Sequence, residues 1–439
     1  MFSRRKRRPQ HPDVLKAWQC LDAGDVPGAL RQLRTGADDL PLPEVALVVA
    51  RAAATAGFDD LRDAATAVSA APDRVRALYD YGYACVERGV HHLAVPALRE
   101  ALNRSGGALP VLRELISAYE GEERHREAVD ALLAHESGLA DWPDGYLLVF
   151  NAVMAGDLPL ARRRHALLPD PDEEMWQPAR DRQNRMLSRA AAAEAVTALD
   201  PEDLRGWQYV IGGTVLGTLS PYGYASGMAG RYAFLQDTHE QCLRGLLRLK
   251  SVLAAAELRP ASVSLLPDRG SRILGHAAAE VLGLPALPFA PEREDTVVVA
   301  HDLNELAGHD EGPRITGQLF HRAPGQVLHE HAGCWTDPPA VTPDSVTLLH
   351  QAVMAPWSGG LRQTADGGVA PGEPDVRPEA DIAADILAAD PAPDDGDGDT
   401  PADPDSRLTA FVTAIRPTWL HGDRAALKTA GPVRSGRFG

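Results

Sequence analysis

Residues 78–101 read LYDYGYACVERGVHHLAVPALREA, the pattern of two helices joined by a tight turn. Apolar and small residues recur at helical spacing on both sides of Gly89. They are Leu78, Tyr81, Gly82 and Cys85 before it, and Ala94, Leu98 and Ala101 after it. Glycine adopts the left-handed backbone conformation that ends a helix without a steric penalty, so Gly89 marks the turn. The stretch therefore predicts a helical hairpin.

This hairpin pattern recurs along the first 170 residues of the chain. The turn positions are Gly24, Gly57, Gly89, Glu123 and Gly156, at intervals of 33, 32, 34 and 33 residues. A regular period of this length is typical of a helical solenoid, in which each hairpin buries its apolar face on its neighbours. We therefore predict helical repeats over residues 11–170. We expect capping helices over residues 171–203, since the last repeat needs a polar outer face.

The repeats resemble the tetratricopeptide repeat. That family has a small residue in its first helix, and here Ala17, Ala50 and Gly82 stand at this position. Its turn glycine is followed five residues later by alanine, as in the pairs Gly24/Ala29, Gly89/Ala94 and Gly156/Ala161. The resemblance implies a concave groove that binds a peptide, a partner helix or a neighbouring domain.

Several positions depart from the tetratricopeptide pattern. Glu123 stands at one turn, Arg62 replaces the alanine of the second unit, and the prolines typical of the repeat ends are missing. A generic array of helical hairpins therefore stays an alternative. A second alternative is that the array only packs on the C-terminal half of the chain.

Residues 204–360 have the alternating strand and helix patterns of an α/β domain. We predict strands over residues 208–216, 261–266, 295–300, 325–331 and 346–351, and helices over residues 236–257 and 273–282. Strand, helix and strand at this spacing form a βαβ unit, which predicts a mostly parallel sheet. The fold class is therefore α + α/β, a helical solenoid followed by an α/β domain.

The candidate ligand site lies at the carboxyl ends of these strands, where open α/β sheets bind their ligands. Its residues are Asp268, Arg269, Ser271, Arg272 and Asp302. A glycine and a hydroxyl ahead of a helix, flanked by two arginines, can hold a phosphate or a carboxylate. The alternative is that Asp268 and Ser271 only cap the helix and the arginines are solvated. Catalytic residues and cofactors stay unassigned.

The segment 261–285 faintly resembles the pyrophosphate-loop strand and helix of type I phosphoribosyltransferases. The resemblance implies that residues 297–302 correspond to the ribose-phosphate strand of that family. The family has two adjacent acids and a Thr/Gly loop after this strand, whereas residues 301–305 read HDLNE. Whether this half of the chain is catalytic therefore stays open.

A group of histidines and one cysteine in the α/β domain has the residue types of a metal site. Its members are His321, His329, His331, Cys334 and His350. His329 and His331 alternate on a predicted strand and so face the same side. Scattered histidines near proline-rich turns also occur as structural residues, and we expect no metal here.

The net charge of −17 is concentrated in one segment. Residues 363–406 hold thirteen acids and one arginine, and without their charge of −12 the chain has −5. Segments rich in proline, glycine and acids bury too little apolar surface to fold. We predict a disordered acidic linker over residues 361–406, with a transient helix at 379–389. We predict a short helix and a loose tail over residues 407–439, and a disordered basic arm over residues 1–10.

The composition of the chain indicates its source, its compartment and the kinds of partner to expect. Four lysines among 44 basic residues, with abundant Ala, Gly and Pro, are typical of a GC-rich bacterial genome. Four scattered cysteines without a CxxC pair argue against a disulfide framework and indicate a reducing cytoplasm. No apolar stretch approaches a membrane span, and the basic start lacks a following hydrophobic core. We expect neither a membrane nor a nucleic-acid partner.

Together these patterns predict a cytoplasmic bacterial protein-interaction scaffold. Its repeat groove would bind a protein or peptide partner, and its α/β domain would sense a ligand or regulate. The alternative is an enzyme that acts on a phosphate-containing small molecule at the edge of the α/β domain.

Overall fold

The computed structural model of the chain describes residues 8–364, 367–426, 429 and 431–435. The chain divides into two compact units between Arg180 and Asp181. Most of the predicted basic arm, residues 1–7, lies outside the described residues. None of the helices in the described part of the chain has the length and apolar character that a bilayer span requires.

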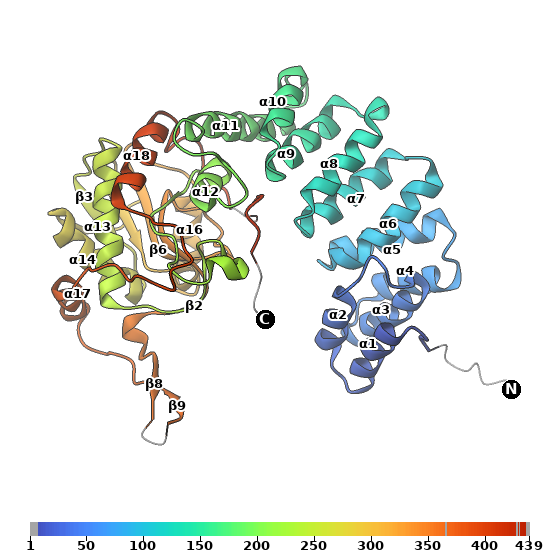
Figure 1. Cartoon of the computed structure of the whole chain (residues 1–439), viewed down its shortest axis with the longest axis horizontal. Helices are drawn as coiled ribbons and strands as arrows, with labels where there is room; N and C mark the ends of the chain where they lie inside the picture. The colour runs from blue at the N-terminus through green and yellow to red at the C-terminus, as the bar shows by residue number, and fades with distance from the viewer. Residues whose placement is uncertain (1–7, 365–366, 427–428, 430, 436–439) are drawn as a thin grey trace. The chain divides into compact units, whose positions relative to one another are not determined.

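The first unit is a series of helix pairs (Figure 1). The first two pairs are α1 (Pro12–Asp22) with α2 (Val26–Arg34), and α3 (Leu42–Ala56) with α4 (Asp59–Ala70). The next two are α5 (Val75–Glu87) with α6 (His91–Ser105), and α7 (Leu109–Gly121) with α8 (His125–Ala134). Then α9 (Tyr146–Met154) pairs with α10 (Leu158–Leu167), and α11 (Gln177–Ala193) crosses the boundary between the units. The predicted helical array is confirmed.

The turns of the array share one backbone geometry. Gly24, Gly57, Gly89, Glu123 and Gly156 all have positive φ, between 56° and 82°. After each of them, the next residue donates its backbone N–H to the carbonyl five positions earlier, at 2.8 to 3.0 Å. This bond satisfies a carbonyl that the helix end leaves unpaired. The 32- to 34-residue period of the sequence is therefore the period of this helix-ending motif.

The second unit contains a parallel sheet. Its strands are β1 (Val215–Leu216), β2 (Tyr232–Gln236), β3 (Ser262–Leu265), β4 (Ala286–Pro288), β5 (Thr296–Ala300), β6 (Val327–Cys334) and β7 (Ser345–Met354). Among the described residues the strand order is β1-β7-β6-β5-β3-β4, and β2 also pairs with β7. All these pairings are parallel. The predicted α + α/β fold class is confirmed.

Helices cover both faces of this sheet. Helices α13 (His239–Ala255) and α14 (Arg269–Leu282) pack on β3, β5, β6 and β7. On the other face, α15 (Leu303–Ala307) and α16 (Gly312–Leu319) share an apolar core with Val298, Ala300 and Leu328. Because side chains alternate along a strand, His329 and His331 face α13, whereas Leu328 and Glu330 face the α15 side. The sheet is thus doubly wound.

The strand predicted over residues 208–216 is wrong for most of its length. Residues Leu204–Gly212 form helix α12, and only Val215–Leu216 form the short strand β1. Asp203 caps the helix by accepting a hydrogen bond from the N–H of Gly206, and Gly213 ends it with φ +79°. Trp207, Tyr209 and Val210 are fully buried, so tertiary packing overrides the strand preference of these aromatic and β-branched residues.

The acidic segment departs from the disorder that its composition predicts. Among its described residues, β8 (Leu361–Gln363) and β9 (Val369–Pro371) form a hairpin, and α17 (Glu379–Ala388) packs on α13 and α14. Ile382 and Ile386 of α17 are fully buried, and the burial of this apolar surface stabilises the helix although the segment around it is acidic.

Further along, Asp403 makes ion pairs with Arg205 and Arg248, at 2.8 and 2.7 Å. After α18 (Asp405–Ile415), the chain keeps contact with the α/β domain. Arg424 is buried and donates to the Asp344 carboxylate at 2.8 Å, and the carbonyl of Val433 accepts from Arg231. These described parts of the predicted loose tail are therefore anchored by buried polar groups.

Candidate functional site

The candidate site lies where β2, β3 and β5 end. Asp237 follows β2, Asp268 lies three residues after β3, and His301 and Asp302 follow β5. Because the strands are parallel, their carboxyl ends meet at the same edge of the sheet. The Ser271 hydroxyl accepts a hydrogen bond from the N–H of His301 at 3.1 Å, which joins the β3 and β5 ends.

Two of the predicted site carboxylates cap helices. Asp268 accepts from the N–H of Ser271 at 2.9 Å at the start of α14, and Asp302 accepts from the N–H of Asn304 at 2.8 Å at the start of α15. Burial raises the pKa of Asp268, and it raises the pKa of Asp302 to about 6. The structure thus brings Asp268, Ser271 and Asp302 together at one edge.

The two predicted arginines bind the chain itself. Arg269 donates to the backbone carbonyls of Asp375 and Arg377, at 2.9 and 2.8 Å. Arg272 pairs with Glu379 at the start of α17, at 2.9 Å. Both guanidinium groups are therefore engaged by the acidic segment, although they flank the site as the sequence predicts.

A second group of side chains lies buried beside this edge, between α13 and the sheet. It consists of Asp237, Cys242 of α13, His301 and His331 of β6, and we call it the Asp–Cys–His cluster. His331 Nε2 lies 2.9 Å from Asp237 Oδ2, and the Cys242 thiol donates to the same oxygen at 3.4 Å. Cys242 Sγ lies 3.8 Å from His331 Nε2, and His301 Nε2 lies 3.6 Å from Asp237 Oδ2.

Charge in the cluster centres on Asp237. Burial would raise the pKa of Asp237, but His331 and His301 beside it outweigh burial and lower the pKa. Burial would lower the pKa of His301, but the nearby Asp237 and Glu305 carboxylates raise it to about 10. Burial and Asp237 raise the pKa of the Cys242 thiol well above its ordinary value. A thiol with a raised pKa is a poor nucleophile, so Cys242 lacks the character of a catalytic cysteine.

Trp357 packs on one member of the cluster, His301, at the sheet edge. Its ring packs against His301, with ring centroids 4.9 Å apart at 64°. A Cβ on Gly270 would lie 2.6 Å from Glu305 Oε2 and 3.6 Å from Trp357, so glycine permits this close packing. Gly359 and Gly360 follow with positive φ, and they direct the chain into the β8–β9 hairpin.

The histidine group considered in the sequence does not gather in one place. His331 belongs to the Asp–Cys–His cluster, whereas His329 lies 3.2 Å from the Ser345 hydroxyl and His350 lies 3.2 Å from the Ala332 carbonyl. His321 is exposed beside Asp423, and the Cys334 sulfur lies near the Thr336 hydroxyl.

Sequence reasoning missed Asp237 and Cys242. The only local indication is the short spacing of the two residues between a strand and a helix, in DTHEQC at 237–242.

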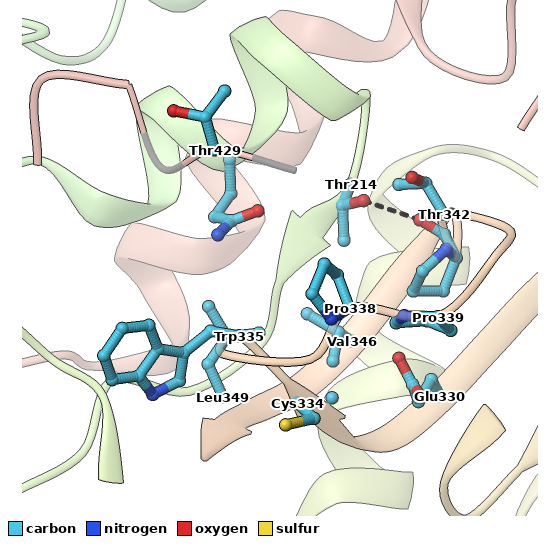
Figure 2. Close-up of a pocket in the computed structure, with 13 residues that line it drawn as sticks. Thr214, Glu330, Cys334, Trp335, Pro338, Pro339, Thr342, Val346, Leu349 and Thr429 are labelled. Atoms are coloured by element: carbon cyan, nitrogen blue, oxygen red, sulfur yellow. Dashed lines mark hydrogen bonds between the residues drawn. The ribbon is translucent and has the colours of Figure 1, made fainter. Parts of the chain in front are cut away.

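A small cavity of about 60 Å³ lies on the opposite face of the sheet (Figure 2). Glu330 lines it together with Pro339 and Thr342. Glu330 accepts a hydrogen bond from the N–H of Leu303 at 2.8 Å, and burial raises the pKa of its carboxyl well above the ordinary value. The cavity has room for only a few water molecules, so it is too small for a phosphate-containing ligand.

Compared with protein-family models, curated proteins and solved structures, the chain matches none of them.

Proposed function

We propose that the chain is a protein-interaction scaffold, in which the helical array binds a protein or peptide and the α/β domain is a ligand-responsive regulatory module. One observation favours a scaffold over an enzyme: at the sheet edge, the arginines that could hold a ligand are already bound by other parts of the chain. Arg269 and Arg272, the groups that would hold a phosphate, bind the carbonyls of residues 375 and 377 and the carboxylate of Glu379. Trp357 lies over His301 at the same edge.

The helical array supports the binding half of the proposal. Tyr79 and Tyr83 stack on α5 with ring centroids 6.3 Å apart, and Tyr83 is 46% exposed. Burial, and less strongly the nearby Glu114 carboxylate of α7, raise the pKa of Tyr79. The aromatic pair therefore lies close to α7, the first helix of the following repeat. Exposed tyrosines provide large contact area at low entropic cost, and they are enriched at binding surfaces. The tetratricopeptide resemblance implies a groove on these first helices.

The cellular context belongs to the proposal too. The four cysteines are free thiols, which supports a bacterial cytoplasm as the compartment.

Photo-crosslinking in the source cell tests the scaffold. A photoreactive amino acid replaces Tyr83 in the full chain, and the control carries it at Arg163, an exposed position on α10. Discrete adducts with a defined protein at position 83, absent at position 163 and lost when Tyr79→Glu is added, support the proposal. Identical adducts at both positions, or none at 83, contradict it.

An enzyme acting on a phosphate compound is the second candidate. It is favoured by the topology, because β3 and β5 are the neighbours at which the chain reverses its winding direction, and such switch points bind ligands. This candidate requires Arg269 and Arg272 to leave the acidic segment. A rise in melting temperature with pyrophosphate or a sugar phosphate, abolished by Arg269→Ala, would favour it over the scaffold, since binding to the folded state stabilises by mass action.

A further inference from the structure

The Asp–Cys–His cluster has the donor atoms of a transition-metal site. Among the described residues, Asp237, Cys242 and His331 bring a carboxylate oxygen, a sulfur and a ring nitrogen within 4.8 Å of one another, and all three side chains are buried. Thiolate, imidazole and carboxylate are the ligands that Zn²⁺ takes in proteins, whereas Ca²⁺ and Mg²⁺ take oxygen donors. The mixed donor set points to the zinc class of ions.

The spacing of the donors fits one tetrahedral ion. Ligand atoms bonded to zinc at about 2.0–2.3 Å stand about 3.3–3.7 Å apart in a tetrahedron. Cys242 Sγ lies 3.4 Å from Asp237 Oδ2 and 3.8 Å from His331 Nε2. The Asp237–His331 distance is 2.9 Å, a hydrogen bond that must lengthen by less than about 1 Å to admit the ion.

His301 lies beside this group of three donors, next to Asp237, and is the candidate for a fourth. It is fully buried, and neither of its ring nitrogens has a hydrogen-bond partner. Buried polar atoms nearly always have a hydrogen-bond partner, so an imidazole whose nitrogens reach only carboxylates at 3.6 and 3.7 Å has room for a closer one. Its Nε2 lies 3.6 Å from Asp237 Oδ2, and its Nδ1 lies 3.7 Å from the Glu305 carboxylate. Metal-bound histidines commonly direct their second nitrogen to a carboxylate in this way.

We propose that Asp237, Cys242, His301 and His331 bind one Zn²⁺-class ion that ties the ends of β2 and β5 to β6 and α13. All four ligands come from the protein and are buried, and Trp357 packs on His301, which makes the site a closed one of the structural kind rather than a catalytic site with an open position. The inference rests on the α/β half of the proposed function and is independent of the helical array.

Cobalt substitution of the full-length reduced protein tests the site. We expect the chelator-treated chain to bind one Co²⁺ with tetrahedral visible bands and a near-ultraviolet thiolate band, and Zn²⁺ to displace it. The test variant is Cys242→Ser, and the matched control is Cys334→Ser, a buried cysteine on β6 outside the cluster. Cys242→Ser should remove the thiolate band and weaken Zn²⁺ binding at least ~10-fold, while Cys334→Ser leaves both unchanged.

X-ray absorption of the zinc-loaded wild type needs no variant, so it decides the matter even if Cys242→Ser fails to fold. One sulfur and three nitrogen or oxygen neighbours support the site. A folded wild type that binds no Co²⁺, a band that survives in Cys242→Ser, or a zinc shell without sulfur would overturn it. Crosslinking at Tyr83 is unaffected by any of these results, so failure here is distinguishable from failure of the scaffold.

Discussion

The Nη1 atom of Arg248 lies 2.7 Å from Oδ2 of Asp403, although the two residues are 155 positions apart in the chain. Arg205 approaches the same carboxylate through two nitrogens, each at 2.8 Å. All three side chains are largely buried, at 3%, 6% and 10% exposure for Arg248, Arg205 and Asp403. One acid of the acidic segment therefore pairs with two arginines inside the α/β domain.

Removing this charge should destabilise the domain. Asp403→Asn leaves the buried Arg205 guanidinium without a carboxylate and leaves Arg248 only the exposed Asp405, at 3.1 Å. Breaking buried ion pairs in this way costs about 3 kcal/mol. We expect the free energy of unfolding, measured by urea denaturation, to fall by roughly that amount. Asp395→Asn removes an exposed acid of the same segment and is the control, with an expected change below about 0.5 kcal/mol. Equal effects of the two substitutions would refute a structural role of the pair.

The Asp403 carboxylate should also make the free energy of unfolding depend on pH. Burial would raise the pKa of Asp403, but Arg205 and Arg248 lower it from 3.8 to about 2. Since the pKa is depressed in the folded state, the stabilisation is complete above pH 3.8 and is lost as the pH falls through about 2. The difference in unfolding free energy between wild type and Asp403→Asn should therefore shrink by about 2 kcal/mol between pH 4.5 and pH 2. A difference that stays constant over this range would show that Asp403 does not titrate with the depressed pKa.

The turn glycines give a third prediction. Gly89 has φ +69° and open space around its Cα, so a methyl group there meets no neighbour but forces a strained backbone. Gly89→Ala should cost about 1 kcal/mol of unfolding free energy, the penalty of an L-residue in the left-handed region. Gly138 is also in open space but lacks positive φ, so Gly138→Ala is the matched control and should leave stability unchanged or slightly higher. Thermal denaturation of both variants measures the contrast.

The helical array could be predicted from the sequence because its turns require a residue that tolerates positive φ. Four of the five turns use glycine, and the fifth holds Glu123 in the same conformation at φ 56°. The strands β3 and β5 could be predicted because continuous apolar runs such as residues 296–300 suit a sheet buried on both faces. In both cases a local rule acts on consecutive residues.

The Asp–Cys–His cluster could not be predicted in this way. Asp237 and His331 are 94 residues apart, and they meet because β2 and β6 both pair with β7. The sequence leaves the strand order open, so nothing local brings these residues together. Helix α12 was missed for a related reason, since burial of Trp207 and Tyr209 on all sides overrides the strand preference of their types.

Trp357 gives the last prediction, which concerns access to the cluster. Its ring covers the fully buried His301, and its removal leaves a cavity that opens toward the exposed Glu305 side chain. Trp357→Ala should therefore raise the rate at which hydroxyl radicals oxidise the His301 ring, as measured by mass spectrometry of the digested protein. His329 is an internal control because it is buried in the sheet beneath α13 and bonded to Ser345. If Trp357 acts as a cover, His301 becomes reactive while His329 stays protected.

Equal gains at both histidines would mean that the substitution unfolds the domain, as the loss of about 3–5 kcal/mol from a large aromatic side chain can do. In that case the smaller change Trp357→Phe, which keeps a ring over His301, should restore protection at both positions.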